Sequence, residues 1–273
     1  MPTQVFSTGR RPTSDHRLEQ MISISVVIIT FNEERNLARC LDSVMDVADE
    51  LIIVDSNSTD GTTAIAARYN AKVIQQPFMG YGQQKNFATQ RAANNWVLSL
   101  DADEELTPKL KQSIQEVKNG PKHNVYEMPR ITSYCGQWIK HCGWYPDRQT
   151  RLYDRTKGSW QEKKVHEYWR ANNENDTKGL LTGDLLHYSF TTISGHIQKI
   201  EKYSELAAIA AVADGKNASF LKVAMYPKWR FITDYIIKLG FLDGYYGYII
   251  CRLASYAAFL KYAKIRAYNK DKR

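Results

Sequence analysis

Uninterrupted apolar runs alternate with amphipathic stretches along the first part of the chain. The β-branched runs at 22–29, 50–55 and 96–100 are typical of strands that are buried on both faces of a sheet. Between them, apolar residues such as Leu37 and Leu41 recur at helical spacing. This βαβ pattern predicts an α/β fold with a doubly wound, mostly parallel sheet and helices on both of its faces.

The pattern changes in the second half of the chain. Residues 134–160 are rich in aromatic and basic side chains, residues 192–213 have helical spacing, and residues 220–268 mix bulky apolar residues with Lys and Arg. An amphipathic helical appendage is therefore expected after the α/β domain. The predicted parts of the chain are a disordered extension over 1–20, an α/β domain over 21–190 and a helical, basic C-terminal region over 191–273.

The net charge of +8 is concentrated in the last fifth of the chain. Residues 216–273 hold 12 Lys and Arg against 3 Asp, which gives +9, and the preceding residues hold 25 against 26 acids. The uncharged runs there, 244–251 and 253–260, fall far short of the roughly 20 residues that span a bilayer. The tail is typical of helices that lie on a membrane surface. A tail that packs back on the domain is the alternative, and no nucleic-acid partner is expected because no RNA-binding motif accompanies the charge.

The cysteine and glycine patterns disfavour several classes of protein. Four widely spaced cysteines without a Cys-x-x-Cys pair are typical of a reduced, cytosolic protein, with a Cys135–Cys142 disulfide as the alternative. The first 20 residues lack the apolar core of a signal peptide, and Met21 is a candidate start directly before the first strand. No Gly-x-Gly-x-x-Gly or Gly-Lys-Ser/Thr loop follows that strand, which weakens dehydrogenase and P-loop interpretations.

Polar side chains stand at the carboxyl ends of three predicted strands. They are Thr30 with Asn32, Asp55, and Asp101 with Asp103. In open α/β sheets the ligand crevice lies at these ends. Residues two apart on an extended backbone point to the same side, so Asp101 and Asp103 can reach one hard cation, and that cation can hold a diphosphate. Interpreting these residues as helix caps leaves Asp103 unexplained.

Four short motifs occur in order between residues 22 and 118. The motifs are Ser25-Val-Val-Ile-Ile-Thr-Phe-Asn-Glu33, Ile53-Val-Asp-Ser-Asn-Ser-Thr-Asp-Gly-Thr62, Gln84-Lys85-Asn86 and Leu100-Asp-Ala-Asp-Glu104. Together they resemble family 2 glycosyltransferases with the GT-A fold. Further on, the segments 143–147, 151–153 and 165–167 are similar to a bacterial subgroup, the lipopolysaccharide inner-core β-1,4-glucosyltransferases, which add glucose to a heptose.

The resemblance implies a nucleotide-sugar donor, most simply a UDP-sugar. It implies that Asp55 hydrogen-bonds the uracil and that Lys85 reaches the base or the phosphates. Thr30, Asn32 and Glu33 are then expected beside the nucleotide.

The same resemblance implies a metal site. Asp101 is expected by the ribose and the water shell of the metal, and Asp103 as a ligand of Mg²⁺ or Mn²⁺, which bridges the diphosphate. Arg148 and Arg151 are candidates for bidentate contacts to the diphosphate. Recognition of acceptor phosphates, or ion pairs with Asp147 and Asp154, are the alternatives for these two arginines.

An inverting transfer also needs a base that takes the proton of the acceptor hydroxyl. Members of this family use an acid in a Glu-Asp-type pair, whereas this sequence has His166-Glu167, about 64 residues after Asp103. We predict Glu167 as the base. His166 is predicted to orient it or to ligate the metal, and His187 is the rival third ligand. A structural histidine and a surface ion pair are the alternatives for His166 and Glu167.

These observations predict an inverting, metal-dependent glycosyltransferase at the cytoplasmic face of the inner membrane. It is expected to move a hexose, most simply glucose from UDP-glucose, onto a heptose of a lipid-anchored lipopolysaccharide core. A polyprenyl-phosphate sugar synthase, another cell-envelope polysaccharide glycosyltransferase and a non-catalytic nucleotide-sugar or nucleic-acid binding protein are the alternatives. The sequence leaves the donor sugar, the exact acceptor and the oligomeric state open.

Overall fold

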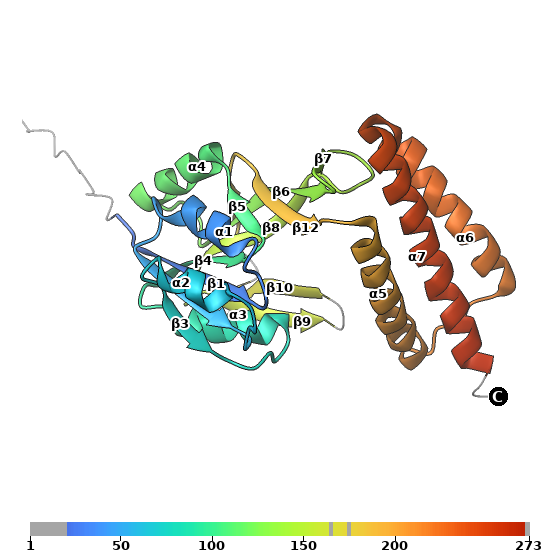
Figure 1. The fold of residues 1–273 in the computed structure, drawn as a ribbon, viewed down its shortest axis with the longest axis horizontal. Helices are drawn as coiled ribbons and strands as arrows, with labels where there is room; N and C mark the ends of the chain where they lie inside the picture. The colour runs from blue at the N-terminus through green and yellow to red at the C-terminus, as the bar shows by residue number, and fades with distance from the viewer. Residues whose placement is uncertain (1–20, 164–165, 174–175, 271–273) are drawn as a thin grey trace, which may run out of the picture.

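The structure is a computed structural model that describes residues 21–163, 166–173 and 176–270. The extension predicted over residues 1–20 lies outside this part of the chain. A sheet with its covering helices forms one side of the molecule, and three long helices form the other (Figure 1). These helices are α5 (Ile193–Ala213), α6 (Phe220–Ile232) and α7 (Gly244–Lys270).

The main sheet of the described chain has ten strands. Eight of them follow the order β3-β2-β1-β4-β8-β6-β12-β5, and β7 and β11 pair with β6. The bounds are β1 Ile24–Thr30, β2 Glu50–Asp55, β3 Lys72–Gln75, β4 Trp96–Asp101, β5 Glu104–Leu106, β6 Val125–Tyr134, β7 Gln137–Ile139, β8 Asp147–Asp154, β11 Lys178–Leu180 and β12 Leu185–Phe190.

The first half of the sheet is parallel, as predicted. β1 pairs in parallel with β2 and β4, and β2 pairs in parallel with β3. β8 runs antiparallel to both β4 and β6, so the sheet becomes mixed beyond β4. The aromatic region over residues 134–160 supplies β8, whereas most of β6 lies before it.

Both faces of the sheet are covered. Alternate residues of β1 point to opposite faces. Val26 and Ile28 pack with α1, α2 and α4, whereas Val27 and Ile29 pack with α3 and with the antiparallel pair β9–β10. The predicted doubly wound α/β fold is therefore confirmed. These elements span α1 Leu37–Val44, α2 Thr62–Ala67, α3 Tyr81–Gln90, α4 Pro108–Asn119, β9 Gly158–Lys163 and β10 His166–Ala171.

The C-terminal region is helical, as the periodicity predicted. The side chains of Thr192 and Ser219 accept hydrogen bonds from the first turns of α5 and α6 and thereby fix where these helices begin. A π-helical turn, η1 (Thr233–Ile237), and a 3₁₀ turn, η2 (Gly240–Asp243), connect α6 to α7. α5 and α7 run in the same direction and α6 runs opposite to them (Figure 1).

An exposed apolar surface runs along α6 into η1. Trp229 is 58% exposed and Ile237 is 61% exposed, although both are bulky apolar residues. α6 lies on the side of the helical region away from the sheet (Figure 1). Across the described residues, no helix combines the length and the apolar character that crossing a bilayer requires. We call this surface the α6 face and define it by Phe220, Leu221, Met225, Trp229, Ile232, Ile236 and Ile237.

Candidate functional site

A cavity of about 780 Å³ lies at the carboxyl ends of β1 and β4. This is where parallel strands of an α/β sheet place their ligands. Its walls come from the sheet, from the start of α3, from β12 and from α5. The lining includes Thr30, Glu33, Ser56, Tyr81, Gln84, Asp101, Asp103, His187, Ser189, Lys199, Lys202 and Tyr203.

Two buried oxygens in this cavity have no hydrogen-bond partner. They are Oγ1 of Thr30 and Oε1 of Gln84. Nε2 of Gln84 does have acceptors, Oγ of Ser56 at 3.2 Å and the carbonyl of Gln76 at 3.2 Å, so the amide is held in place. Buried polar atoms are almost always satisfied in folded proteins. Two residues that line the cavity thus each carry a buried oxygen that no other described group satisfies.

The loops after β1 and β2 are tied together beside this cavity. The buried carboxylate of Asp55 accepts hydrogen bonds from the backbone N–H and the hydroxyl of Ser58, at 2.8 and 2.5 Å. Oγ of Ser58 in turn accepts from the backbone N–H of Asn32, and Oδ1 of Asn32 accepts from that of Thr59. Asn32 has a φ of 54°, a left-handed conformation that asparagine tolerates better than most residues. Asp55 and Asn32 thus shape the loops, and their contact with a nucleotide stays a prediction.

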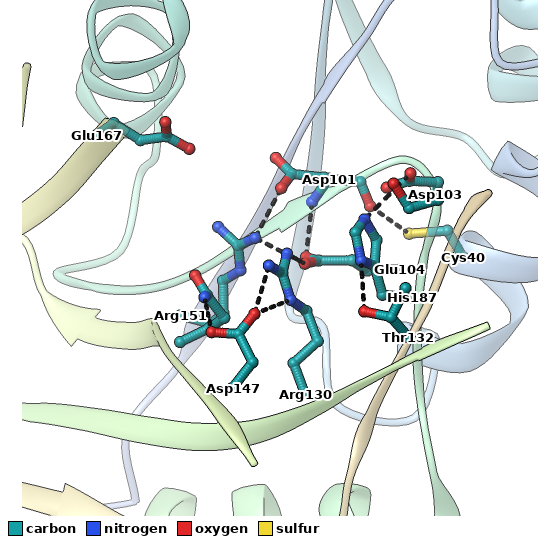
Figure 2. Close-up of polar contacts among 12 residues, drawn as sticks. Cys40, Asp101, Asp103, Glu104, Arg130, Thr132, Asp147, Arg151, Glu167 and His187 are labelled. Carbon is teal, nitrogen blue, oxygen red and sulfur yellow. Dashed lines mark hydrogen bonds and ion pairs between the residues drawn. The ribbon is translucent and has the colours of Figure 1, made fainter. Parts of the chain in front are cut away.

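Asp101 is held by two cations. Its Oδ2 lies 2.6 Å from Nη2 of Arg151 (Figure 2). Its Oδ1 lies 3.2 Å from Nζ of Lys85. Burial alone would raise the pKa of Asp101, but the guanidinium of Arg151 and the ammonium of Lys85 hold that pKa well below its usual range. Asp101 is therefore ionised at neutral pH.

Glu167 joins this group through Lys85. Its Oε1 accepts a hydrogen bond of 2.9 Å from Nζ of Lys85, a side chain that is fully buried. Burial acts to raise the pKa of Glu167, and the neighbouring ammonium of Lys85 outweighs it, so that the pKa is lowered. One buried lysine thus holds Asp101 and Glu167 ionised beside each other, although residue 167 is distant in sequence from both.

Arg151 belongs to a chain of ion pairs inside the protein. Its Nη2 lies 2.6 Å from Oε1 of Glu104, and the same oxygen lies 3.0 Å from Nη1 of Arg130. Arg130 then contacts Asp147 at 2.6 Å, while Oε2 of Glu104 accepts from the backbone N–H of Asp101 (Figure 2). The carboxylates beside Arg151 are thus Asp101 and Glu104, and a contact between Arg151 and a diphosphate stays a prediction.

Asp103 and His187 face each other across the cavity wall. Oδ2 of Asp103 lies 3.4 Å from Nε2 of His187, and Nδ1 of His187 lies 3.2 Å from Oγ1 of Thr132, which orients the ring (Figure 2). Adjacent ligands of an octahedral cation lie roughly 3 Å apart, since each stands about 2.1 Å from the ion. The carboxylate and the imidazole therefore fit two adjacent positions around one divalent cation.

The described side chains do not complete a metal site by themselves. Among them, no group of three or more His, Cys, Asp and Glu is arranged to hold a metal ion. The side chain of His166, the other predicted ligand, lies outside what the structure describes; its backbone begins β10. Asp103 and His187 would leave the remaining positions around a cation to ligand oxygens and water.

Glu33 also lines the cavity. Its carboxylate accepts a hydrogen bond of 2.7 Å from Nδ2 of Asn36. Burial raises the pKa of Glu33, the hydrogen bond from Asn36 opposes this, and the charge of Asp103 raises it further. Glu33 and Asp103 thus place a second acidic pair in the same space.

The wall formed by α5 was not foreseen from the sequence. Of the described Lys and Arg residues, Lys199 and Lys202 line the cavity. Nζ of Lys199 donates to the carbonyl and the hydroxyl of Ser189, at 3.0 and 3.1 Å. Tyr203, one turn further, lines the cavity together with Tyr81 at the start of α3, and burial is the main reason why the pKa of Tyr81 is raised. The only sequence signal here was a helical apolar stripe, which says nothing about the polar face.

The family model and the sequence relatives agree on one family. The model of glycosyl transferase family 2 matches residues 25–173. An uncharacterized glycosyltransferase of Rickettsia typhi is 34% identical over 255 residues, which cover 90% of this chain and 87% of that protein. The lipopolysaccharide core biosynthesis glycosyltransferase LpsC of Rhizobium meliloti is 32% identical over 259 residues, covering 89% and 92%. Among solved structures, S. aureus TarS 1-349 covers 92% of each chain at 14% identity, with a TM-score of 0.45.

Proposed function

The chain belongs to glycosyl transferase family 2, and from that premise we propose that it is an inverting, metal-dependent hexosyltransferase of lipopolysaccharide core synthesis. That it is a glycosyltransferase with the GT-A fold follows from the family and from the sheet. We propose UDP-glucose as the donor and a core heptose as the acceptor. The likeness to LpsC supports an acceptor in the lipopolysaccharide core because it covers 89% of the chain, which is more than the α/β domain alone.

One observation supports this function above the others. A single cavity holds unpartnered oxygens of Thr30 and Gln84 on one side and the Asp103–His187 pair on another. The first feature suits a nucleoside, whose polar edges need fixed hydrogen-bond partners. The second suits the cation that accompanies a diphosphate. A nucleotide sugar joins both chemistries in one molecule.

We assign the donor side of the cavity as follows. Thr30, Asn32, Glu33 and Asp55 bound the nucleoside pocket, either by direct contact or by shaping its loops. Asp103 and His187 would hold Mg²⁺ or Mn²⁺, with the oxygens of the diphosphate as further ligands. When bound there, the cation offsets the negative charge that develops on the departing diphosphate.

Glu167 remains the proposed base. In the transfer, the acceptor oxygen forms a bond to the anomeric carbon, and the bond between that carbon and the diphosphate oxygen breaks. The proton of the acceptor hydroxyl passes to the carboxylate of Glu167. Because Lys85 keeps Glu167 ionised, the carboxylate is ready to accept this proton at neutral pH. Attack from the face opposite the diphosphate inverts the anomeric configuration.

The α6 face supports attachment to the cytoplasmic surface of the inner membrane. Exposed apolar side chains such as Trp229 stand beside exposed lysines such as Lys222 and Lys228. Apolar residues insert at the lipid interface, and each Lys or Arg near an anionic bilayer adds about 1 kcal/mol of attraction. We propose that this face docks on anionic phospholipid and brings the cavity to a lipid-linked acceptor.

A transfer assay tests the proposed function. The purified full-length protein is incubated with UDP-glucose, Mn²⁺ and lipopolysaccharide that ends at the inner-core heptose, and the product is identified by NMR. We expect a β-linked glucose on heptose. Polyprenyl phosphate serves as the second acceptor, and glucose transfer to it alone would reject the lipopolysaccharide assignment. Failure to transfer or hydrolyse any of a panel of nucleotide sugars would reject the catalytic assignment.

A further inference from the structure

A second hollow of about 400 Å³ lies between α5, α6 and α7. α5 and α7 contact each other through two apolar clusters, one with Ile193 and Ile250 and the other with Ala208 and Ile265. Between these clusters the facing side chains of α7 are small, and they leave a groove halfway along the helices. The small residues are Ala254, Ala257 and Ala258.

This groove opens on the cavity described above. Lys199 and Tyr203, one turn apart on α5, line both the groove and the cavity. Both side chains are exposed. The groove and the cavity are therefore neighbours, with these two side chains between them.

The groove is cationic and aromatic. Among the described residues that line it are Lys199, Arg230 and Lys261, and none is Asp or Glu. Arg230 is paired with Asp234 outside the lining, whereas no carboxylate pairs with Lys199 or Lys261 in the described chain. Two ammonium groups without a carboxylate partner among the described residues favour an anionic occupant of the groove.

The rings of the groove favour a saccharide. Tyr226 of α6 and Tyr262 of α7 both line the hollow and pack edge to face, with their centroids 4.8 Å apart. His196 lines it as well, and burial lowers the pKa of His196 to about 4, which keeps its imidazole neutral. Aromatic side chains offer an apolar body with a polar tip, which suits a sugar ring and its hydroxyls.

We propose that this groove binds the acceptor, an anionic saccharide carried on a lipid, and directs its terminal hydroxyl past Lys199 and Tyr203 into the cavity. The inference rests on the proposed function, since the donor must occupy the cavity for the groove to serve an acceptor. α6 carries the exposed α6 face on one side and Tyr226 on the groove side. A lipid held at the α6 face thus lies beside the groove that receives its saccharide.

The test measures saccharide binding directly. Ala257→Trp fills the groove and Lys261→Glu reverses its charge; Ala267→Trp and Lys270→Glu are matched controls at exposed positions of the same helix. The probe is the anionic oligosaccharide obtained by deacylating lipopolysaccharide that ends at the inner-core heptose. Calorimetry in the presence of UDP and Mn²⁺ should show binding to the wild-type protein, and roughly tenfold weaker binding to both groove variants. The controls should stay within about twofold of the wild type.

Three results would overturn the inference. They are a wild-type protein that does not bind the oligosaccharide, groove variants that bind it as well as the wild type, and groove variants that lose UDP affinity by the same factor. A neutral oligosaccharide that binds as tightly as the anionic one would refute the role of charge. A wild-type protein that binds the oligosaccharide but transfers no sugar would contradict the proposed function, while the groove is still judged by the variants. Circular dichroism melts confirm that each variant is folded.

Discussion

The sheet wall and the α5 wall of the cavity hold their charges in opposite ways. On the sheet side, Asp101 lines the cavity, and the buried cations Lys85 and Arg151 behind it are already paired with Asp101, Glu104 and Glu167. On the helix side, exposed lysines face the cavity without carboxylate partners among the described residues. Buried pairs are desolvated during folding, so the sheet wall is preorganised before any ligand arrives.

Lys and Arg residues therefore have two different roles here, to position carboxylates and to bind a ligand, and the sequence alone does not distinguish them. A buried cation that pairs with side chains of the protein fixes their place, as Lys85 does for Asp101 and Glu167. A cation that faces the cavity unpaired is available to a ligand, as with Lys199 and Lys202. The matched family span, residues 25–173, contains the first wall and none of the second.

The first prediction places the chemistry on the sheet wall. Glu167→Gln should lower kcat by about a thousandfold, because the amide cannot accept the acceptor's proton. The UDP affinity of Glu167→Gln should stay near that of the wild type. Asp103→Ala should lose both turnover and UDP binding in the presence of Mn²⁺. Steady-state kinetics and calorimetry on the same preparations measure both effects. Turnover near the wild-type value in Glu167→Gln would remove Glu167 as the base.

The second prediction concerns what the buried pairs do for the fold. Arg151→Met leaves Asp101 and Glu104 without their shared guanidinium, so the free energy of unfolding should fall by about 3–5 kcal/mol. Arg148→Met, at an exposed position of the same strand, should change it by less than about 0.5 kcal/mol. Urea unfolding followed by circular dichroism measures both. Equal stability of the two variants would mean that the sheet wall does not depend on this ion pair.

A third prediction follows from the lowered pKa of Asp101. A carboxylate whose pKa is lower in the folded state stabilises that state above its unfolded pKa, about 3.9, and this stability is lost as the pH falls. The free energy of unfolding should therefore decrease below about pH 4. The total decrease should be about 1.4 kcal/mol for each unit by which folding lowers the pKa of Asp101. The decrease should be shallower in Arg151→Met, where one of the two cations is missing. Thermal melts between pH 3 and pH 7 would contradict the linkage if both proteins gave parallel curves.

Local sequence patterns predicted the residues of the sheet wall better than those of the α5 wall. The β-branched runs and the acids that follow them predicted β1, β2 and β4 and the polar ends that line the cavity, because strand burial and strand direction are local properties. The link between Lys85 and Glu167 spans 82 positions and depends on how β10 packs against α3. Lys199 had no motif at all, since only the packing of α5 beside the cavity gives its position a meaning.

The last prediction tests the helix wall on its own. The double variant Lys199→Met/Lys202→Met should bind UDP roughly tenfold more weakly, because these lysines are the cations of the described lining that a diphosphate can reach. Uridine, which carries no phosphate, should bind equally well to the variant and to the wild type. Lys216→Met, an exposed lysine outside the cavity, is the matched control and should leave both affinities unchanged. A parallel loss of uridine affinity would show that α5 only supports the fold of the cavity, and the contrast between its two walls would then disappear.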